Sequence, residues 1–200
     1  LSGRQTQADA EFVAPDFSAA SFSAPILAYQ VTGRRTRDQD LALVLSPRGT
    51  VSYGGDTLLA LVEGYNYTEP TTVPFEIIND LDSVITRDTL RFTGTRAVEP
   101  QVVRIVPDSQ PLGELRLRVG SGSETKQTSA LVSFSGAWIL TNYSDMIDLL
   151  RYFGHEDLIK QLKKAPVNER PRLWQEFYKK TDPVPATPEN EALEQYFGRM

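Results

Sequence analysis

Two sequence patterns follow one another in this chain, and the change between them lies close to Trp138. Before this residue, short apolar runs alternate with clusters of Gly, Pro, Asp and Asn. In the run Glu114–Val119, apolar and charged side chains alternate with a period of two, which is typical of a strand with one buried face. A series of such short runs predicts an all-β, immunoglobulin-like β-sandwich over residues 23–138.

After Trp138 the apolar residues recur with the period of a helix, which predicts a small all-α subdomain over residues 139–200. Capping residues and prolines set the expected boundaries of four short helices. These are Asp145–Phe153 with Ser144 as its N-cap, Glu156–Lys164, a third helix capped by Asn168 that ends near Thr181, and a fourth that begins at Thr187 and Pro188.

Residues 1–22 follow neither pattern. They are mostly small and polar, with Phe12 and Phe17 among them. We expect an extended N-terminal arm, either a disordered leader or a segment that becomes ordered on another subunit.

Residues 181–188, which we call the proline elbow, connect the expected third and fourth helices. Pro183 should end the third helix, because the residue before a proline avoids helical geometry and the proline itself has no N–H to donate. Pro183 and Pro185 favour an extended connector. Thr187 is expected to cap the fourth helix, with Pro188 at its first helical position.

The acidic residues of this region could instead form a metal or acid–base cluster made of Asp182, Glu189 and Glu191. No histidine is nearby in the sequence, and acids in a first helical turn interact favourably with the helix dipole. We therefore interpret the region as a stiff structural element, built from Asp182, Pro183, Pro185, Thr187, Pro188, Asn190 and Glu191.

The sequence offers few residues for catalysis or for binding a metal or cofactor. There are no cysteines, and His155 is the only histidine, so a zinc site lacks its usual ligands. No G-x-S-x-G nucleophile motif accompanies His155. Asp38–Asp40 and Asn79–Asp82 do not continue into a calcium-loop pattern and are expected to be turns. We predict no catalytic residue, metal site or cofactor, and assign no small-molecule substrate.

The bulk charge and hydrophobicity exclude further classes of partner. The formal net charge of −5 argues against a dedicated nucleic-acid-binding protein. No run approaches the roughly 20 apolar residues that a membrane-spanning helix needs.

The region after Trp138 is rich in large aromatic residues. Four short helices are not expected to cover all of these rings. Aromatic side chains contribute strongly to protein–protein interfaces. We expect partner contacts at Tyr178, Tyr196 and Phe197, together with Phe12 and Phe17 of the arm.

The run from Leu173 to Arg199 reads LWQEFYKKTDPVPATPENEALEQYFGR. It resembles the segment just upstream of the signature in bacterial GWxTD-domain proteins, and the shared residues are Phe177, Asp182, Pro183, Pro185, Thr187, Asn190, Glu191, Tyr196 and Arg199. This sequence departs from the family pattern at Tyr178, Thr181 and Val184, and the signature itself would follow Met200. The resemblance implies a bacterial protein exported to the cell envelope, with no established catalysis.

Together these features predict a non-enzymatic, extracytoplasmic accessory or scaffold subunit that docks on and braces a larger membrane-associated complex through protein–protein contacts. Two alternatives remain open. One is a carbohydrate- or peptide-binding module that uses the strand loops near Asn66, Asn79 and Asp108. The other is the N-terminal part of an enzyme whose chemistry lies beyond Met200, where we expect the chain to continue because the last helix has no C-cap.

Overall fold

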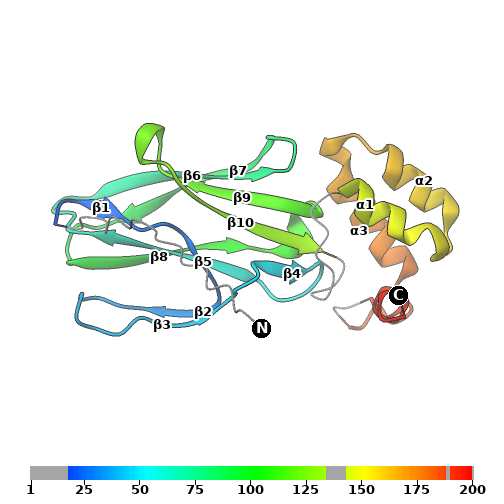
Figure 1. Ribbon diagram of the computed structural model, residues 1–200, viewed down its shortest axis with the longest axis horizontal. Coiled ribbons are helices and arrows are strands. Elements are labelled where there is room, and N and C mark those ends of the chain that lie inside the picture. The colour runs from blue at the N-terminus through cyan, green and yellow to red at the C-terminus, as the bar shows by residue number, and fades with distance from the viewer. Residues whose placement is uncertain (1–17, 134–142, 188–189, 200) are drawn as a thin grey trace, which may run out of the picture.

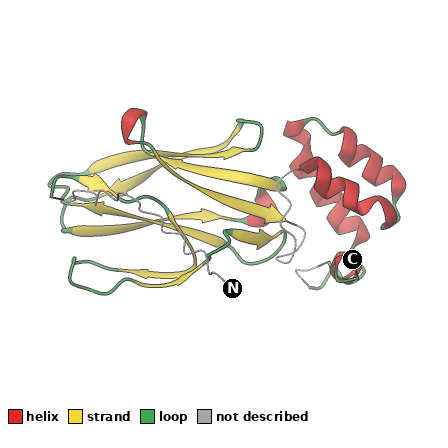
Figure 2. Cartoon of the chain, in the orientation of Figure 1, coloured by secondary structure: helices red, strands yellow, loops and turns green. Residues whose placement is uncertain are grey.

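Two β-sheets at one end of the molecule and a group of helices at the other make up the structure (Figures 1 and 2). A computed structural model of the chain describes residues 18–133, 143–187 and 190–199. The strands all precede the helices in the sequence, as the change of pattern near Trp138 predicts.

The first sheet is built around a long central strand, β5. Its strands are β1 (Ser21–Phe22), β2 (Ile26–Gly33), β3 (Ala42–Leu45), β5 (Leu58–Tyr65) and β8 (Val98–Ile105). β5 pairs antiparallel with β8 over its whole length, and with β1 and β2 along its other edge. β3 pairs with β2 and lies at the edge of the sheet. Because β1 belongs to this sheet and Phe22 is buried, the expected arm does not extend through residue 22.

The second sheet has the order β4-β10-β9-β6-β7. Its strands are β4 (Thr50–Ser52), β6 (Thr71–Asn79), β7 (Val84–Phe92), β9 (Gly113–Val119) and β10 (Lys126–Ser133). Short 3-10 turns at Pro107–Ser109 and Gly122–Glu124 flank β9. All pairings are antiparallel except that of β4 with β10. β9 alternates between buried and half-buried residues, so the period-two prediction for Glu114–Val119 is confirmed.

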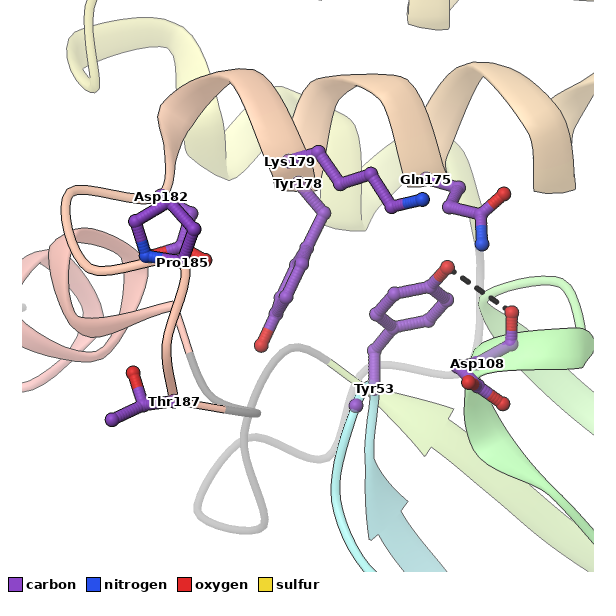
Figure 3. A pocket seen from close by; sticks show the side chains of 9 residues that line it. Tyr53, Asp108, Gln175, Tyr178, Lys179, Asp182, Pro185 and Thr187 are labelled. Carbon is purple, nitrogen blue, oxygen red and sulfur yellow. Dashed lines mark hydrogen bonds between the residues drawn. The ribbon is translucent and has the colours of Figure 1, made fainter.

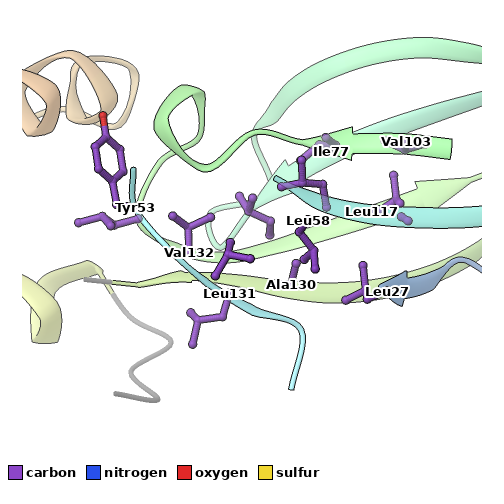
Figure 4. Close-up of a cluster of buried hydrophobic side chains, with 14 of the residues drawn as sticks. Leu27, Tyr53, Leu58, Ile77, Val103, Leu117, Ala130, Leu131 and Val132 are labelled. Carbon is purple, nitrogen blue, oxygen red and sulfur yellow. The ribbon is translucent and has the colours of Figure 1, made fainter. Parts of the chain in front are cut away.

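The two sheets share one hydrophobic core, which Figure 4 shows in part. Leu58 and Val103 of the first sheet and Ile77, Leu117 and Val132 of the second belong to the same buried cluster. Apolar side chains on facing sheets stabilise a fold by about 25 cal/mol for each Å² that they remove from water. The expected arrangement of two strand layers around a core is confirmed.

Four α-helices follow in the described residues. They are α1 (Tyr143–Leu149), α2 (Glu156–Lys164), α3 (Arg170–Thr181) and α4 (Glu191–Phe197), with 3-10 turns at Leu150–Tyr152 and Val167–Glu169. The bounds predicted for the second helix are those observed for α2. α3 ends at Thr181, as Pro183 requires.

Two predicted N-caps are wrong. Ser144 lies inside α1 rather than before it, because the helix starts at Tyr143, whose hydroxyl donates to the Leu162 carbonyl of α2. Asn168 lies inside a 3-10 turn, and α3 begins without a side-chain cap bond at Glu169. In neither place does the expected capping residue mark the start of the helix.

An aromatic contact joins the helices to the sandwich. The ring of Tyr53, just after β4, stands edge-on to Trp174 of α3, with 5.8 Å between ring centroids. It also lies 5.1 Å from the ring of Tyr178. Trp174 and Phe177 are buried in the same cluster as the sandwich core. Sandwich and helical subdomain are therefore packed on one continuous core.

Two buried carboxylates lie on neighbouring strands at the end of the sandwich far from the helices. Glu63 of β5 is paired with Pro100 of β8, and Glu99 of β8 is paired with Gly64 of β5. Glu99 accepts hydrogen bonds from the backbone N–H groups of Thr93 at 2.6 Å and Thr95 at 2.9 Å. Glu99 therefore holds the loop between β7 and β8 in place.

The contact between sandwich and helices can be tested with Trp174→Ala. The ring is almost completely buried, so its removal should lower the free energy of unfolding by about 3–5 kcal/mol in urea denaturation. Tyr152→Ala is the matched control, because that ring is 75% exposed, and it should change stability by less than about 0.5 kcal/mol. Equal effects of the two substitutions would contradict this packing.

Glu99 should make stability depend on pH. Burial raises the pKa of Glu99, but the hydrogen bonds from Thr93 and Thr95 outweigh this effect, so the pKa lies below its usual value. The charged carboxylate therefore stabilises the fold above the unfolded-state pKa of about 4.3, and this contribution disappears as the pH falls through the folded-state value.

We expect Glu99→Gln to be less stable than the unchanged protein at neutral pH, and the difference to shrink in acid. Urea unfolding of both proteins across the acidic range measures this, with the exposed Glu69→Gln as a control for the lost charge. A difference that is constant with pH would show that Glu99 does not act through its ionisation.

Candidate functional site

The polar side chains of the proline elbow contact nearby backbone groups. The Asp182 carboxylate accepts a hydrogen bond from the Val184 N–H at 2.9 Å. The Thr187 hydroxyl donates to the Val184 carbonyl at 2.9 Å, and the Thr187 N–H donates to the same oxygen at 3.1 Å. These contacts fold the segment after α3 into a tight turn.

Asn190 joins the ends of α3 and α4. Its side-chain amide donates to the Tyr178 carbonyl at 2.8 Å and to the Thr181 hydroxyl at 2.9 Å, and its side-chain oxygen accepts from the Leu193 N–H at 3.0 Å. Its backbone N–H donates to the Tyr178 hydroxyl at 2.8 Å. This buried side chain satisfies groups at the end of one helix and at the start of the next.

The prediction that Thr187 caps the fourth helix is therefore wrong: the N-cap of α4 is Asn190. The physical reason is that an amide both donates and accepts, so one side chain can close α3 and open α4. Thr187 lies before the helix, and Pro188 is outside the described residues.

The alternative acidic cluster is not assembled in the described part of the chain. Asp182 bonds to the backbone of its own turn, and Glu191 contacts the Thr187 hydroxyl. Glu189 lies outside the described residues. Within residues 18–133, 143–187 and 190–199, no group of three His, Cys, Asp or Glu side chains is placed to hold a metal ion.

A cleft of about 460 Å³ lies between the sandwich and α3 (Figure 3). Tyr53 and Tyr178 form part of its wall, and Lys179, Asp108 and Asp182 contribute charged groups. The Tyr53 hydroxyl donates to the Asp108 carbonyl at 3.1 Å. Burial raises the pKa of Tyr53 well above its usual value, and the charge of Asp108 acts in the same direction, so the hydroxyl stays neutral. The Thr187 hydroxyl also lines the cleft, and it donates to the Val184 carbonyl of its own turn.

The three loop residues suggested for ligand binding do not form one site. Asp108 lines the cleft, but Asn66 and Asn79 do not. The Asn66 side chain donates to the Ser18 carbonyl, and the Asn79 side chain accepts from the N–H groups of Leu81 and Ser83. Both asparagines therefore have local structural contacts.

The structure also places the other residues that the sequence offered for catalysis or metal binding. His155 adopts a left-handed conformation just before α2, with its ring centroid 6.1 Å from that of Phe153. Asp82 forms an ion pair with Arg116 at 2.6 Å, while Asp38 and Asp40 are exposed in the turn between β2 and β3.

The expected aromatic patch on the helices is not an exposed surface. Phe197 is buried, and Tyr196 lies against Phe153 while its hydroxyl donates to the Leu149 carbonyl. Tyr178 is half-buried against Tyr53. Tyr196 packs within the chain because α4 lies against the end of α1 and the turn after it. Phe12 and Phe17 lie outside the described residues.

An exposed apolar edge is the feature that sequence reasoning missed. Val44 and Leu45 of β3 are 51% and 56% exposed, and Tyr29 of the neighbouring β2 is 45% exposed. The uninterrupted apolar run Leu41–Leu45 is visible in the sequence, but such a run usually indicates a buried strand. Here it forms one side of a β2–β3 hairpin at the edge of the sheet (Figure 1).

Comparisons with known proteins identify no relative by sequence: no family model matches this chain, and no curated protein matches it. Among solved structures, it is similar to the CARDB domain of a Pyrococcus furiosus protein, solved in complex with di-metal ions. The sequence identity is 10%, the match covers 60% of this chain and 99% of that one, and the TM-score is 0.29. A TM-score this low supports no conclusion about ligands. No described helix has the length and apolar character needed to cross a bilayer.

The role of Asn190 predicts unequal effects of two substitutions. Asn190→Ala removes the helix cap and both bonds to the end of α3, so it should lower the free energy of unfolding by about 2 kcal/mol. Thr187→Ala removes an exposed bond within the turn and should cost less than about 0.5 kcal/mol. Chemical denaturation measures both, and a larger loss for Thr187→Ala would restore Thr187 as the important cap.

Proposed function

We propose that this protein is a non-enzymatic accessory subunit that assembles with other protein subunits through the free edge of β3. The observation that carries this proposal is the exposure of apolar side chains on an edge strand. The Thr187 hydroxyl in the cleft at α3 bonds within its own turn, so the cleft gives catalysis no comparable support.

The edge of β3 has the features of a strand-pairing site. An edge strand presents backbone N–H and C=O groups along one side, and these groups can pair with a strand of another chain. β3 contains neither proline nor a charged residue. The two register shifts of the β2–β3 pair are bulges in β2, at Tyr29 and Thr32, so β3 itself has no bulge.

The other sheet edges carry features that hinder strand pairing. β8 contains Pro100 and Arg104, and β7 carries several charged residues. β4 has only three residues and β1 only two. Proline, charge and short length are the means by which natural proteins protect their edges. Among the described strands, β3 is therefore the edge best suited to a partner.

A second copy of this chain fits the β3 edge by charge. Asp38 and Asp40 precede the strand and Arg48 follows it, and all three are exposed. None of them forms an ion pair with a described residue. In an antiparallel pair of two β3 strands, Asp40 of each copy would lie near Arg48 of the other. Such a pairing is symmetric, as in most protein dimers.

The proposal has two further parts. The sandwich is of the immunoglobulin-like kind, which two mainly antiparallel five-stranded sheets around one core support. The protein acts in the bacterial envelope as part of a membrane-associated complex, which the resemblance of residues 173–199 to GWxTD-domain proteins supports. Self-association through β3 would place two copies of this subunit in such a complex.

The assembly proposal can be tested with Val44→Lys. We expect the unchanged protein to form a concentration-dependent dimer in size-exclusion chromatography with light scattering. The variant should raise the dissociation constant of the dimer by about a hundredfold, because the symmetric interface contains the substitution twice and each lysine costs about tenfold.

Leu81→Lys is the matched control. Leu81 is an aliphatic residue of similar exposure, 50%, but lies in the turn between β6 and β7. It should leave the dimer unchanged. A protein that remains monomeric at every concentration would overturn self-pairing, as would a dimer that survives Val44→Lys.

A further inference from the structure

The turn of the β2–β3 hairpin lies at the end of the sandwich far from the helices (Figure 1). Arginine side chains gather at this turn. They line a pocket of about 560 Å³, which we call the arginine pocket. Its polar lining comes from Thr32, Arg34, Arg35, Gln39 and Arg96. Arg96 belongs to the loop between β7 and β8, so two segments far apart in the sequence build the site.

A close approach between Gly33 and Pro100 brings these segments together. Gly33 has a φ of +70°, and a Cβ atom at this position would lie 2.8 Å from the Pro100 side chain. Glycine is therefore required here, both for the backbone conformation and for the contact with β8. The contact places Arg34 and Arg35 on the same pocket as Arg96.

Arg34 is fixed by the buried Glu63. Its Nε atom lies 3.0 Å from Glu63 Oε1, and Nη2 lies 3.1 Å from Oε2, which also accepts the Tyr65 hydroxyl at 2.7 Å. The carboxylate thus neutralises Arg34 and holds its guanidinium at the wall of the pocket. Such a paired, hydrogen-bonded arrangement is what a buried carboxylate requires.

No acidic side chain offsets the positive charges of Arg35 and Arg96 in the described part of the chain. Among the described residues, neither guanidinium forms an ion pair, and no acidic residue lines the pocket. Asp38 and Asp40 follow in the same turn, but they are exposed and outside the lining. In a chain with a net charge of −5, two positive charges around one hollow form a localised site for an anion.

We propose that the arginine pocket binds a phosphate monoester. Guanidinium groups match phosphate oxygens with two parallel hydrogen bonds, and Thr32 and Gln39 add polar groups to the same wall. The volume lies within the usual range of small-ligand sites, about 300–1,000 Å³, and leaves room for the esterified group. The phosphate comes from either a free small molecule or a lipid headgroup. This site does not depend on pairing through β3.

The first test measures binding of glycerol phosphate by isothermal titration calorimetry, with glycerol as the uncharged probe. We expect binding of glycerol phosphate alone. Arg35→Gln and Arg96→Gln should each weaken it about tenfold, because each removes a charge-assisted contact. Arg91→Gln, at an exposed arginine of β7 outside the pocket, is the matched control and should bind unchanged.

The second test separates the two sources of phosphate with flotation of phosphatidylcholine vesicles that contain or lack phosphatidic acid. Binding only to vesicles with phosphatidic acid, lost in the double variant Arg35→Gln/Arg96→Gln, supports a lipid headgroup. Binding of glycerol phosphate without vesicle binding supports a free ligand. Absence of both, or binding that survives the double variant, would overturn the proposal. Circular dichroism of the variants checks that they fold.

Discussion

The arrangement of the molecule depends on the contact between Tyr53 and Trp174. Tyr53 lies just after β4 of the sandwich, and Trp174 is a buried residue of α3. The two rings therefore join the sandwich to the helical subdomain, and no backbone hydrogen bond links these two parts in the described elements. Aromatic pairs of this geometry contribute beyond the area they bury. With α3 fixed on the sandwich, Asn190 can fix α4 on α3, and the cleft beside Tyr53 follows from the same contact.

Patterns that involve one element were readable in the sequence. The period of β9, the bounds of α2 and the end of α3 before Pro183 all depend on neighbours along the chain. The cap at Asn190 was not readable, because its partners include the end of another helix. The contacts of Tyr196 were missed for the same reason, since they are made with Leu149 of α1 and with Phe153 after it.

The candidate surfaces on the sandwich were less predictable still. An uninterrupted apolar run such as Leu41–Leu45 looks alike whether a strand is central or at an edge, and only the sheet order distinguishes the two. The arginine pocket combines residues about sixty positions apart, Arg35 and Arg96, which meet because Gly33 packs on Pro100. The one signal in the sequence was composition: before Trp138 the chain uses many arginines and a single lysine, Lys126.

The dependence of the helical end on one amide has a chemical consequence. Asparagine side chains deamidate as proteins age, and the product is aspartate. At residue 190 an aspartate would still accept from the Leu193 N–H, but a carboxylate oxygen would replace the NH2 group that donates to the Tyr178 carbonyl. α4 would remain capped, while the contact of residue 190 with the Tyr178 carbonyl of α3 would become repulsive. Because this side chain is buried, the new negative charge would also be kept from water at the joint between α3 and α4.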